Sequence, residues 1–370
     1  MKNKELLDIY SDYLISAFGQ TTGTGLAELL GGSVSHDQIQ RLLAKEEMRA
    51  ADLWQIVKPY VRQIQQEDGV IIIDDSIAEK PYTDENAIIC WHYDHSQDRS
   101  VKGINFVTCL YHSSGYSLPV GFSIVAKTEY YIDKKEGQQK RRSPISKNEY
   151  YRQLLTNATS NQIPFRYVLS DVWYSAAENM LFIKHELSKD FVMPLKANRK
   201  VALSEATKRN GQWIRLDALT LEANTPLEIY LESVDFPLLL LKQVFTNEDG
   251  STGIQYLVSS HTRLSPDQMT TIYRKRWNVE PYHKSLKQNA SLENHRPKPL
   301  PPKPIICLLH FMPISSSNGY VKRLNSITLP SNRNSISLHC IRLLLPFVNY
   351  SLFICLRKVS YSMLSLLLWQ

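Results

Sequence analysis

The chain has 370 residues, of which 43% are hydrophobic and 21% are charged, so it is long enough to fold into two or three domains. Its five cysteines are too few for a disulfide framework, and residues 1–13 are charged, without the apolar core of a signal peptide. The net charge is +7, but nine of the 43 Lys and Arg residues and only one of the 36 acidic residues fall in the last 80 positions. The first 290 residues are therefore nearly neutral, and any DNA-binding surface there must be a local patch.

Residues 1–65 are predicted to be helical. One helix ends at Gly31 and Gly32, and the next begins at Ser35 with Gln38 three residues later, which is the pattern of a capping box. Helix, glycine turn and helix is the outline of a helix-turn-helix, although most short helical hairpins bind no DNA. We interpret this region as a possible DNA-binding region.

Two apolar runs predict buried strands that end in acidic residues. Val70–Ile73 is continuously apolar and precedes Asp74 and Asp75, and the run Arg166–Ser170 precedes Asp171. A carboxylate is costly to bury, so a carboxylate at the end of a buried strand commonly points into a functional site. Each Asp considered alone could equally be a turn former or a helix cap.

The segment between these two strands predicts a hairpin of strands at 104–111 and 118–125, followed by a basic loop. The loop contains Lys140, Arg141 and Arg142, which would be an ordinary solvated patch in most proteins. Near a DNA site the same cations would contact phosphates.

The next part of the chain changes from strands to a long helix. Residues 200–260 are rich in strand patterns, and a helix is predicted from Ser265 to Asn289, with Pro266 at its first position. Each residue of an α-helix is rotated by about 100° from the one before, so four polar side chains of this helix lie within roughly 60° of one another on one face. These side chains are Tyr273, Arg276, Glu280 and Lys287.

Together the acidic residues could form a site for hard cations. Two strand-end carboxylates and a third carboxylate on a helix provide oxygen ligands, which suit Mg²⁺ or Mn²⁺ rather than zinc. Two such ions about 3.5–4 Å apart promote phosphodiester cleavage and transfer. Neighbouring Arg and Lys side chains bind phosphates, although a solvated, ion-paired helix face would explain the same spacing.

The run Tyr273 to Lys287 reads YRKRWNVEPYHKSLK, and it fits the Tyr-x2-Arg-x3-Glu-x6-Lys signature of bacterial insertion-sequence DDE transposases. The order of strand-Asp, strand-Asp, β-rich insertion and helix-Glu also resembles that family, over about residues 70–290. The resemblance implies an α/β (α+β) fold, with a ribonuclease-H-like mixed sheet flanked by helices. It also implies that the strand-rich stretch at 200–260 is a β-rich insertion, and the sequence pattern of residues 1–65 adds an N-terminal helical region to this fold.

The resemblance further implies site residues and a cofactor. Asp74, Asp171 and Glu280 would be the catalytic triad and would bind two Mg²⁺ or Mn²⁺ ions, with Asp75 as the alternative to Asp74. Tyr273, Arg276 and Lys287 would hold DNA phosphates near the cleaved end. Further candidate DNA contacts are Lys284, Lys140, Arg141, Arg142 and Arg199.

Residues 291–370 lack the pattern of a folded domain. They contain no Ala, and eight of the 18 Pro residues. An apolar segment at 343–356 is shorter than the roughly 20 residues that a membrane-spanning helix needs, and the Leu and aromatic content is high for a disordered tail. With suitable codons, one added A near residue 293 restores an Ala-rich, amphipathic helical pattern. We therefore predict that the chain is frameshifted after about residue 293.

The expected organisation has four parts. They are a helical region at 1–65, a catalytic core at 66–199 and 261–290, a β-rich insertion at 200–260, and an aberrant tail at 291–370. The expected function is transposition in the bacterial cytoplasm, at the nucleoid, by a homodimer that cuts and joins double-stranded DNA at element ends and target sites. The alternatives are a catalytically dead DNA-binding remnant of such an enzyme and, from a different class, a membrane-anchored protein.

Overall fold

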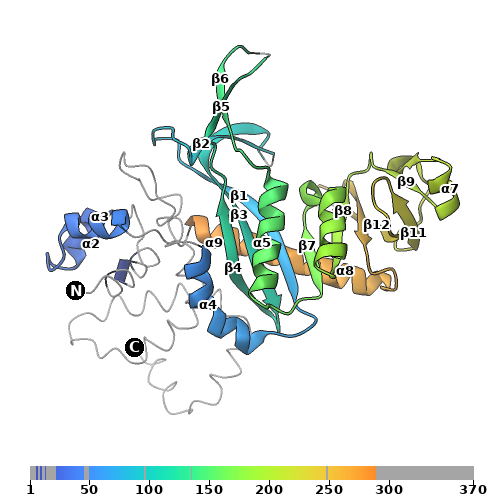
Figure 1. The fold of residues 1–370 in the computed structure, drawn as a ribbon, viewed down its shortest axis with the longest axis horizontal. Helices are drawn as coiled ribbons and strands as arrows, with labels where there is room; N and C mark the ends of the chain where they lie inside the picture. Colours follow the sequence, from blue (N-terminus) through green and yellow to red (C-terminus); the bar gives the residue numbers. More distant parts are fainter. Residues whose placement is uncertain are drawn as a thin grey trace. The chain divides into compact units, whose positions relative to one another are not determined.

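The computed structural model describes residues 6, 9, 10, 13, 22–45, 50–95, 97–134, 136–246 and 249–288 (Figure 1). The predicted tail at 291–370, with its proposed frameshift and its apolar segment, lies outside these residues, and so does most of the segment 1–13. Within the described ranges, no helix is long and apolar enough to cross a membrane.

Three helices with defined bounds precede the first strand. They are α2 (Gly23–Leu29), α3 (His36–Lys45) and α4 (Ala50–Ile64). Helix α2 stops before Gly31 and Gly32, which both have positive φ angles. At the start of α3 the Ser35 and Gln38 side chains each accept a hydrogen bond from the other residue's backbone N–H. The predicted helix, glycine turn and second helix are therefore confirmed, whereas DNA binding by this region stays a prediction.

Eleven strands of the described residues form one mixed sheet in the order β10-β9-β11-β12-β13-β8-β7-β1-β3-β2, with β4 also paired to β3. Their bounds are β1 (Val70–Glu79), β2 (Ile89–Asp94), β3 (Arg99–Ser113), β4 (Tyr116–Ile124), β7 (Tyr167–Ser170), β8 (Asp190–Leu195), β9 (Lys200–Ala202), β10 (Ile214–Arg215), β11 (Pro226–Leu231), β12 (Leu238–Thr246) and β13 (Thr252–Ser259). Strand β1 runs parallel to β7 and antiparallel to β3. This mixed sheet with flanking helices confirms the predicted α/β fold class and is consistent with a ribonuclease-H-like fold.

Two groups of helices cover the sheet around β1. Helix α5 (Lys147–Ser160) begins with a capping box of Ser146 and Glu149 and packs against β3 and β4. Helix α9 (Val279–Gln288) packs against β1. Figure 1 shows α5 in front of the sheet and the orange α8 and α9 behind it. The strands predicted at 200–260 extend the same sheet, because β13 pairs with β8.

The prediction of a basic loop was wrong. This segment is a separate two-stranded hairpin of β5 (Glu129–Ile132) and β6 (Gln139–Arg142), in which two tyrosines of one strand pair with cations of the other. In the strand-rich region, β10 is short and is followed by the 3₁₀ turn η3 (Leu216–Ala218). Asp171 caps the 3₁₀ turn η1 (Val172–Tyr174), and α6 (Ala177–Leu181) starts after it without a side-chain cap. A π-helical turn, η2 (Phe182–Glu186), continues α6.

The long helix predicted from Ser265 is not continuous. It consists of α8 (Pro266–Arg274), the 3₁₀ segment η4 (Lys275–Asn278) and α9. Pro281 lies near the start of α9, has no N–H for the carbonyl of Trp277, and its ring crowds that carbonyl. The break therefore falls between Tyr273 and Glu280, so the predicted single helical face does not extend unchanged across this motif.

Candidate active site

Asp74 and Asp171 lie on neighbouring strands. The parallel pairing of β1 with β7 ends at the pair Ile73 and Ser170, so the next residue of each chain segment is one of the two aspartates. Strand β1 does not end at Ile73, as the apolar run suggests, because its pairing with β3 continues to Glu79. Two carboxyl groups 97 positions apart in sequence are thus brought to one place on the sheet.

The two aspartates share an environment that disfavours their charge. The pKa of Asp74 is raised to about 8, mainly by burial and then by the nearby Asp171 and Asp75, and Arg276 offsets only part of this rise. Burial also raises the pKa of Asp171, partly offset by the hydrogen bond that its carboxylate accepts from the N–H of Trp173. The single guanidinium nearby does not offset burial and repulsion, so the carboxyl pair has the electrostatics of a cation site.

Arg276 connects Asp74 with Glu280. Its Nη1 atom donates to Asp74 Oδ2 at 3.3 Å and to Glu280 Oε1 at 3.4 Å. The Arg276 side chain is only 8% exposed, while that of Glu280 is 52% exposed. The 3₁₀ segment η4 and the first turn of α9 therefore bring the predicted third acid to the face of β1 that carries Asp74.

A further contact fixes α9 on this face. Thr108 of β3 lies opposite Asp74, and its hydroxyl is 2.8 Å from Nε2 of His283 and donates to the Asp74 carbonyl at 3.3 Å. His283 is buried three residues after Glu280, so this contact sets the distance of the Glu280 segment from β1. Sequence reasoning missed this contact, because 175 positions separate the two residues and His283 occupies one of the unspecified positions of the motif.

The other predicted phosphate-binding residues of the motif differ in exposure. Tyr273 is buried, and the guanidinium carbon of Arg276 lies 5.9 Å from the centre of its ring. Lys284 is exposed and Lys287 is half-buried on α9. Tyr273 and Arg276 thus lie among the carboxylates, and the phosphate contacts of all four residues stay predictions.

The predicted DNA-binding cations outside the motif contact residues other than Asp74, Asp171 and Glu280. On the hairpin, Lys140 pairs with Asp133 at 2.9 Å, and Arg141 and Arg142 pair with Glu85 and Glu129. Arg199 is half-buried after β8, where its carbonyl accepts a hydrogen bond from the N–H of Leu216. The three hairpin cations would have to exchange these acidic partners for DNA phosphates.

Asp75, the alternative metal ligand, is engaged elsewhere. Its carboxylate accepts hydrogen bonds from Lys147 Nζ at 2.6 Å and from the Tyr174 hydroxyl at 2.8 Å, and Asn105 Nδ2 lies 3.4 Å from it. Successive side chains of a strand point to opposite faces, so Asp75 does not share the face of Asp74. These contacts support Asp74, rather than Asp75, as the first acid of the site.

The donor set fits a hard divalent cation. Asp74, Asp171 and Glu280 offer carboxylate oxygens, the ligand type of Mg²⁺ and Mn²⁺. Across the described ranges, no three His, Cys, Asp or Glu side chains already converge as a metal site, and Arg276 lies between Asp74 and Glu280. Asp74 and Glu280 thus share one guanidinium, which provides the positive charge between them.

Aromatic side chains surround the segment after Asp171. Trp173 is 49% exposed, the ring of His95 stacks on it at 4.3 Å, and Lys196 Nζ lies 4.0 Å from its ring centre. His92 is buried in β2, with its Nε2 3.3 Å from Cys90 Sγ.

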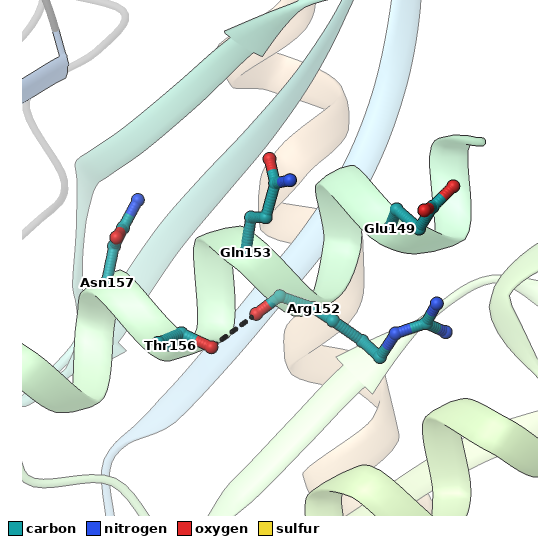
Figure 2. A pocket seen from close by; sticks show the side chains of 5 residues that line it. All are labelled: Glu149, Arg152, Gln153, Thr156 and Asn157. Carbon is teal, nitrogen blue, oxygen red and sulfur yellow. Dashed lines mark hydrogen bonds between the residues drawn. The ribbon is translucent and has the colours of Figure 1, made fainter. Parts of the chain in front are cut away.

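One surface pocket lies on α5 and is not this site. Figure 2 shows its lining on one side of that helix, with the α8–α9 segment behind the strands. Its polar groups are used locally: Thr156 donates to the carbonyl of Arg152, and the Arg152 side chain donates to Asn179. The lining residues are Glu149, Arg152, Gln153, Thr156 and Asn157.

Comparison with known families gives one match. A family model described as DDE superfamily endonuclease matches residues 2–225, which is more than half of the chain. The matched region includes Asp74 and Asp171 and ends before Glu280. Comparison with curated proteins gave no match.

Proposed function

The chain belongs to the DDE superfamily endonucleases, and we propose that it is an insertion-sequence transposase that cuts and joins DNA. The observation that carries this proposal is the arrangement of Asp74 beside Asp171, with Glu280 joined to Asp74 through Arg276. The proposed substrates are double-stranded DNA ends of the element and a target duplex. The proposed setting is the bacterial nucleoid.

In this proposal Asp74, Asp171 and Glu280 hold two Mg²⁺ or Mn²⁺ ions. Bound ions of this kind activate a water or 3′-hydroxyl and stabilise the leaving oxygen in phosphodiester chemistry. Water attacks phosphorus at the element end, the bond from phosphorus to the 3′ oxygen breaks, and a 3′-hydroxyl is released. That hydroxyl then attacks a target phosphodiester, so one phosphodiester bond replaces another without an external energy source.

The chain's own residues orient these groups. Arg276 holds one oxygen of Asp74 and one of Glu280, and the Trp173 N–H holds one oxygen of Asp171. Lys284 and Lys287, seven or fewer residues after Glu280, would bind the phosphates that flank the cut. We assign end recognition to α2 and α3 and expect a homodimer on paired ends, by analogy with insertion-sequence transposases.

The change of sequence pattern after about residue 293 favours a second candidate function, that of a catalytically dead DNA-binding remnant of a transposase. A chain whose C-terminal part is out of frame could keep DNA binding and lose catalysis. Both candidates bind DNA, so binding alone does not separate them.

Strand cleavage separates the two candidates. The full chain is incubated with labelled duplexes that carry the DNA bordering its own gene, with Mg²⁺, with Mn²⁺ or with EDTA. We expect metal-dependent nicking that Glu280→Ala abolishes while DNA binding persists, and that Glu232→Ala, at an exposed position, leaves unchanged. Binding without nicking in either metal would support the remnant instead.

A further inference from the structure

The hydrogen bond between Tyr174 and Asp75 spans the two segments that carry the predicted metal-binding aspartates. Backbone pairing of β1 with β7 ends at Ile73 and Ser170, one residue before Asp74 and Asp171. Beyond that point the Tyr174 hydroxyl donates to Asp75 Oδ1 at 2.8 Å. This side-chain bond thus continues the connection of the two segments where the backbone ladder stops.

The Tyr174 side of this bond is rigid. Tyr174 is 1% exposed, and its ring stacks on that of Tyr151 with centres 5.0 Å apart and planes 18° apart. Its backbone N–H donates to the Asp171 carbonyl, and the Asp171 carboxylate caps the same turn through the N–H of Trp173. Because the turn is short and capped, a shift of the Tyr174 ring would shift Asp171 as well.

The Asp75 side is equally fixed. Its backbone N–H donates to Asp74 Oδ1 at 2.9 Å, and Arg276 holds the other oxygen of Asp74. Its own carboxylate is anchored by Lys147 at the start of α5. The orientation of the Asp74 carboxylate therefore depends on the backbone of the residue that Tyr174 holds.

We propose that Tyr174 and Asp75 form a positioning pair that sets the spacing of Asp74 and Asp171 and thereby the affinity of the chain for divalent cations. This inference rests on the proposed function, because it assumes that the two aspartates bind metal. Neither residue touches the metal or DNA in this role. Removal of a residue that hydrogen-bonds to a metal ligand commonly lowers metal affinity by about 10- to 100-fold.

The test measures metal binding without DNA or catalysis. Mn²⁺ is titrated into the full chain, binding is followed by the loss of the free Mn²⁺ electron paramagnetic resonance signal, and the midpoint of the binding curve is compared between variants. Tyr174→Phe removes only the hydroxyl and keeps the stacked ring, so we expect a folded protein whose Mn²⁺ midpoint is about tenfold higher. At saturating Mn²⁺, the cleavage rate of this variant should recover towards the wild-type rate, although its Mn²⁺ midpoint stays higher.

The matched control is Tyr111→Phe. Tyr111 is also buried, and its hydroxyl exchanges hydrogen bonds with the backbone of Gln66. This variant should lose stability without any change in the Mn²⁺ midpoint. It therefore separates a general loss of stability from the positioning effect.

A double-mutant cycle supplies the second variant. Asp75→Ala should also raise the Mn²⁺ midpoint, and Tyr174→Phe should add nothing further in that background, because the shared bond is already gone. If Tyr174→Phe does not fold, Asp75→Ala alone must raise the midpoint for the inference to survive.

The outcomes distinguish this inference from the proposed function. If the wild-type Mn²⁺ response is lost in Asp74→Ala but unchanged in Tyr174→Phe, the positioning pair is refuted and the function stands. Additive effects of Tyr174→Phe and Asp75→Ala would also refute the pair. A wild-type chain without any Mn²⁺ response would overturn the proposed function, and this inference with it.

Discussion

Arg276 donates from Nη1 to Asp74 Oδ2 over 3.3 Å, with a side chain that is 8% exposed. The same atom reaches Glu280, so one guanidinium joins the η4–α9 segment to β1. A residue that the motif presents as a phosphate ligand thus lies among the carboxylates of the site. Its geometry suits arginine, because a planar guanidinium can bond two carboxylates at once, whereas an ammonium is a point charge.

Arg276→Lys should therefore impair the site although the charge is kept. We expect at least about a tenfold lower cleavage rate and a loss of about 1–3 kcal/mol in the free energy of unfolding, since buried carboxylate hydrogen bonds are left unmade. Single-turnover cleavage and urea unfolding measure the two effects. Arg274→Lys is the control, because Arg274 is exposed in the same motif. Equal effects of the two substitutions would contradict this role.

Asp74→Asn should stabilise the metal-free protein while abolishing cleavage. The pKa of Asp74 is about 8 in the folded chain, against about 3.9 in an unfolded chain, so folding takes up a proton between these values. Stability is therefore full below about pH 4 and is lost as pH rises towards about 8. Asparagine removes this loss, on the order of 1 kcal/mol or more at pH 8.

Thermal unfolding in EDTA between pH 5 and 9 tests this prediction. The gain in Tm for Asp74→Asn over the wild type should grow with pH. A variant that is less stable than wild type at pH 8 would be the opposite result.

His283 should make the fold sensitive to acid. Burial lowers its pKa to about 3, assisted by Lys287, whereas an unfolded histidine titrates near 6.5. The unfolded chain therefore binds an extra proton between these values, and stability present above about pH 6.5 is lost as pH falls towards 3. Each such histidine contributes a slope of up to about 1.4 kcal/mol per pH unit.

His92 has a similar shift, so the wild-type slope should include both residues. His283→Gln should reduce the slope of unfolding free energy against pH by the contribution of one proton. Denaturant unfolding at several pH values between 4 and 7 provides the slopes. An unaltered slope in His283→Gln would show that this residue is not the acid-sensitive group.

The gene itself should reveal the predicted frameshift. Resequencing the codons for residues 288–299 and the DNA downstream should show that one added A opens a frame with an Ala-rich, helix-forming sequence. If the added A is present in the gene, the intact enzyme gains that helix. A downstream frame that encodes nothing helical would contradict the frameshift.

Local patterns predicted the elements that carry the acids. The apolar run at 70–73 and the run before Asp171 indicated buried strands, and these strands are neighbours in the sheet. The capping box at Ser146 and the glycine stop after α2 were also readable, because each depends on residues a few positions apart. The break at η4 was readable in principle, since Pro281 stands in the sequence.

Contacts between distant segments could not be predicted in the same way. The Arg276–Asp74 bond joins residues 202 positions apart, and the bond between Tyr174 and Asp75 joins residues 99 apart. A motif gives the residue types and spacing on one element, but the fold determines what each side chain meets. For this reason Arg276 was predicted as a phosphate ligand and its contact with Asp74 was not.

The most direct test of the central claim is to map the cut at nucleotide resolution. Duplexes with the element's own ends are incubated with the full chain and Mg²⁺, and the product ends are identified. The account predicts a nick at the element end that leaves a 3′-hydroxyl, with cleavage lost in Asp74→Asn and Asp171→Asn while binding persists. Cleavage that survives both substitutions, or DNA binding by the wild type with no metal-dependent nick, would contradict it.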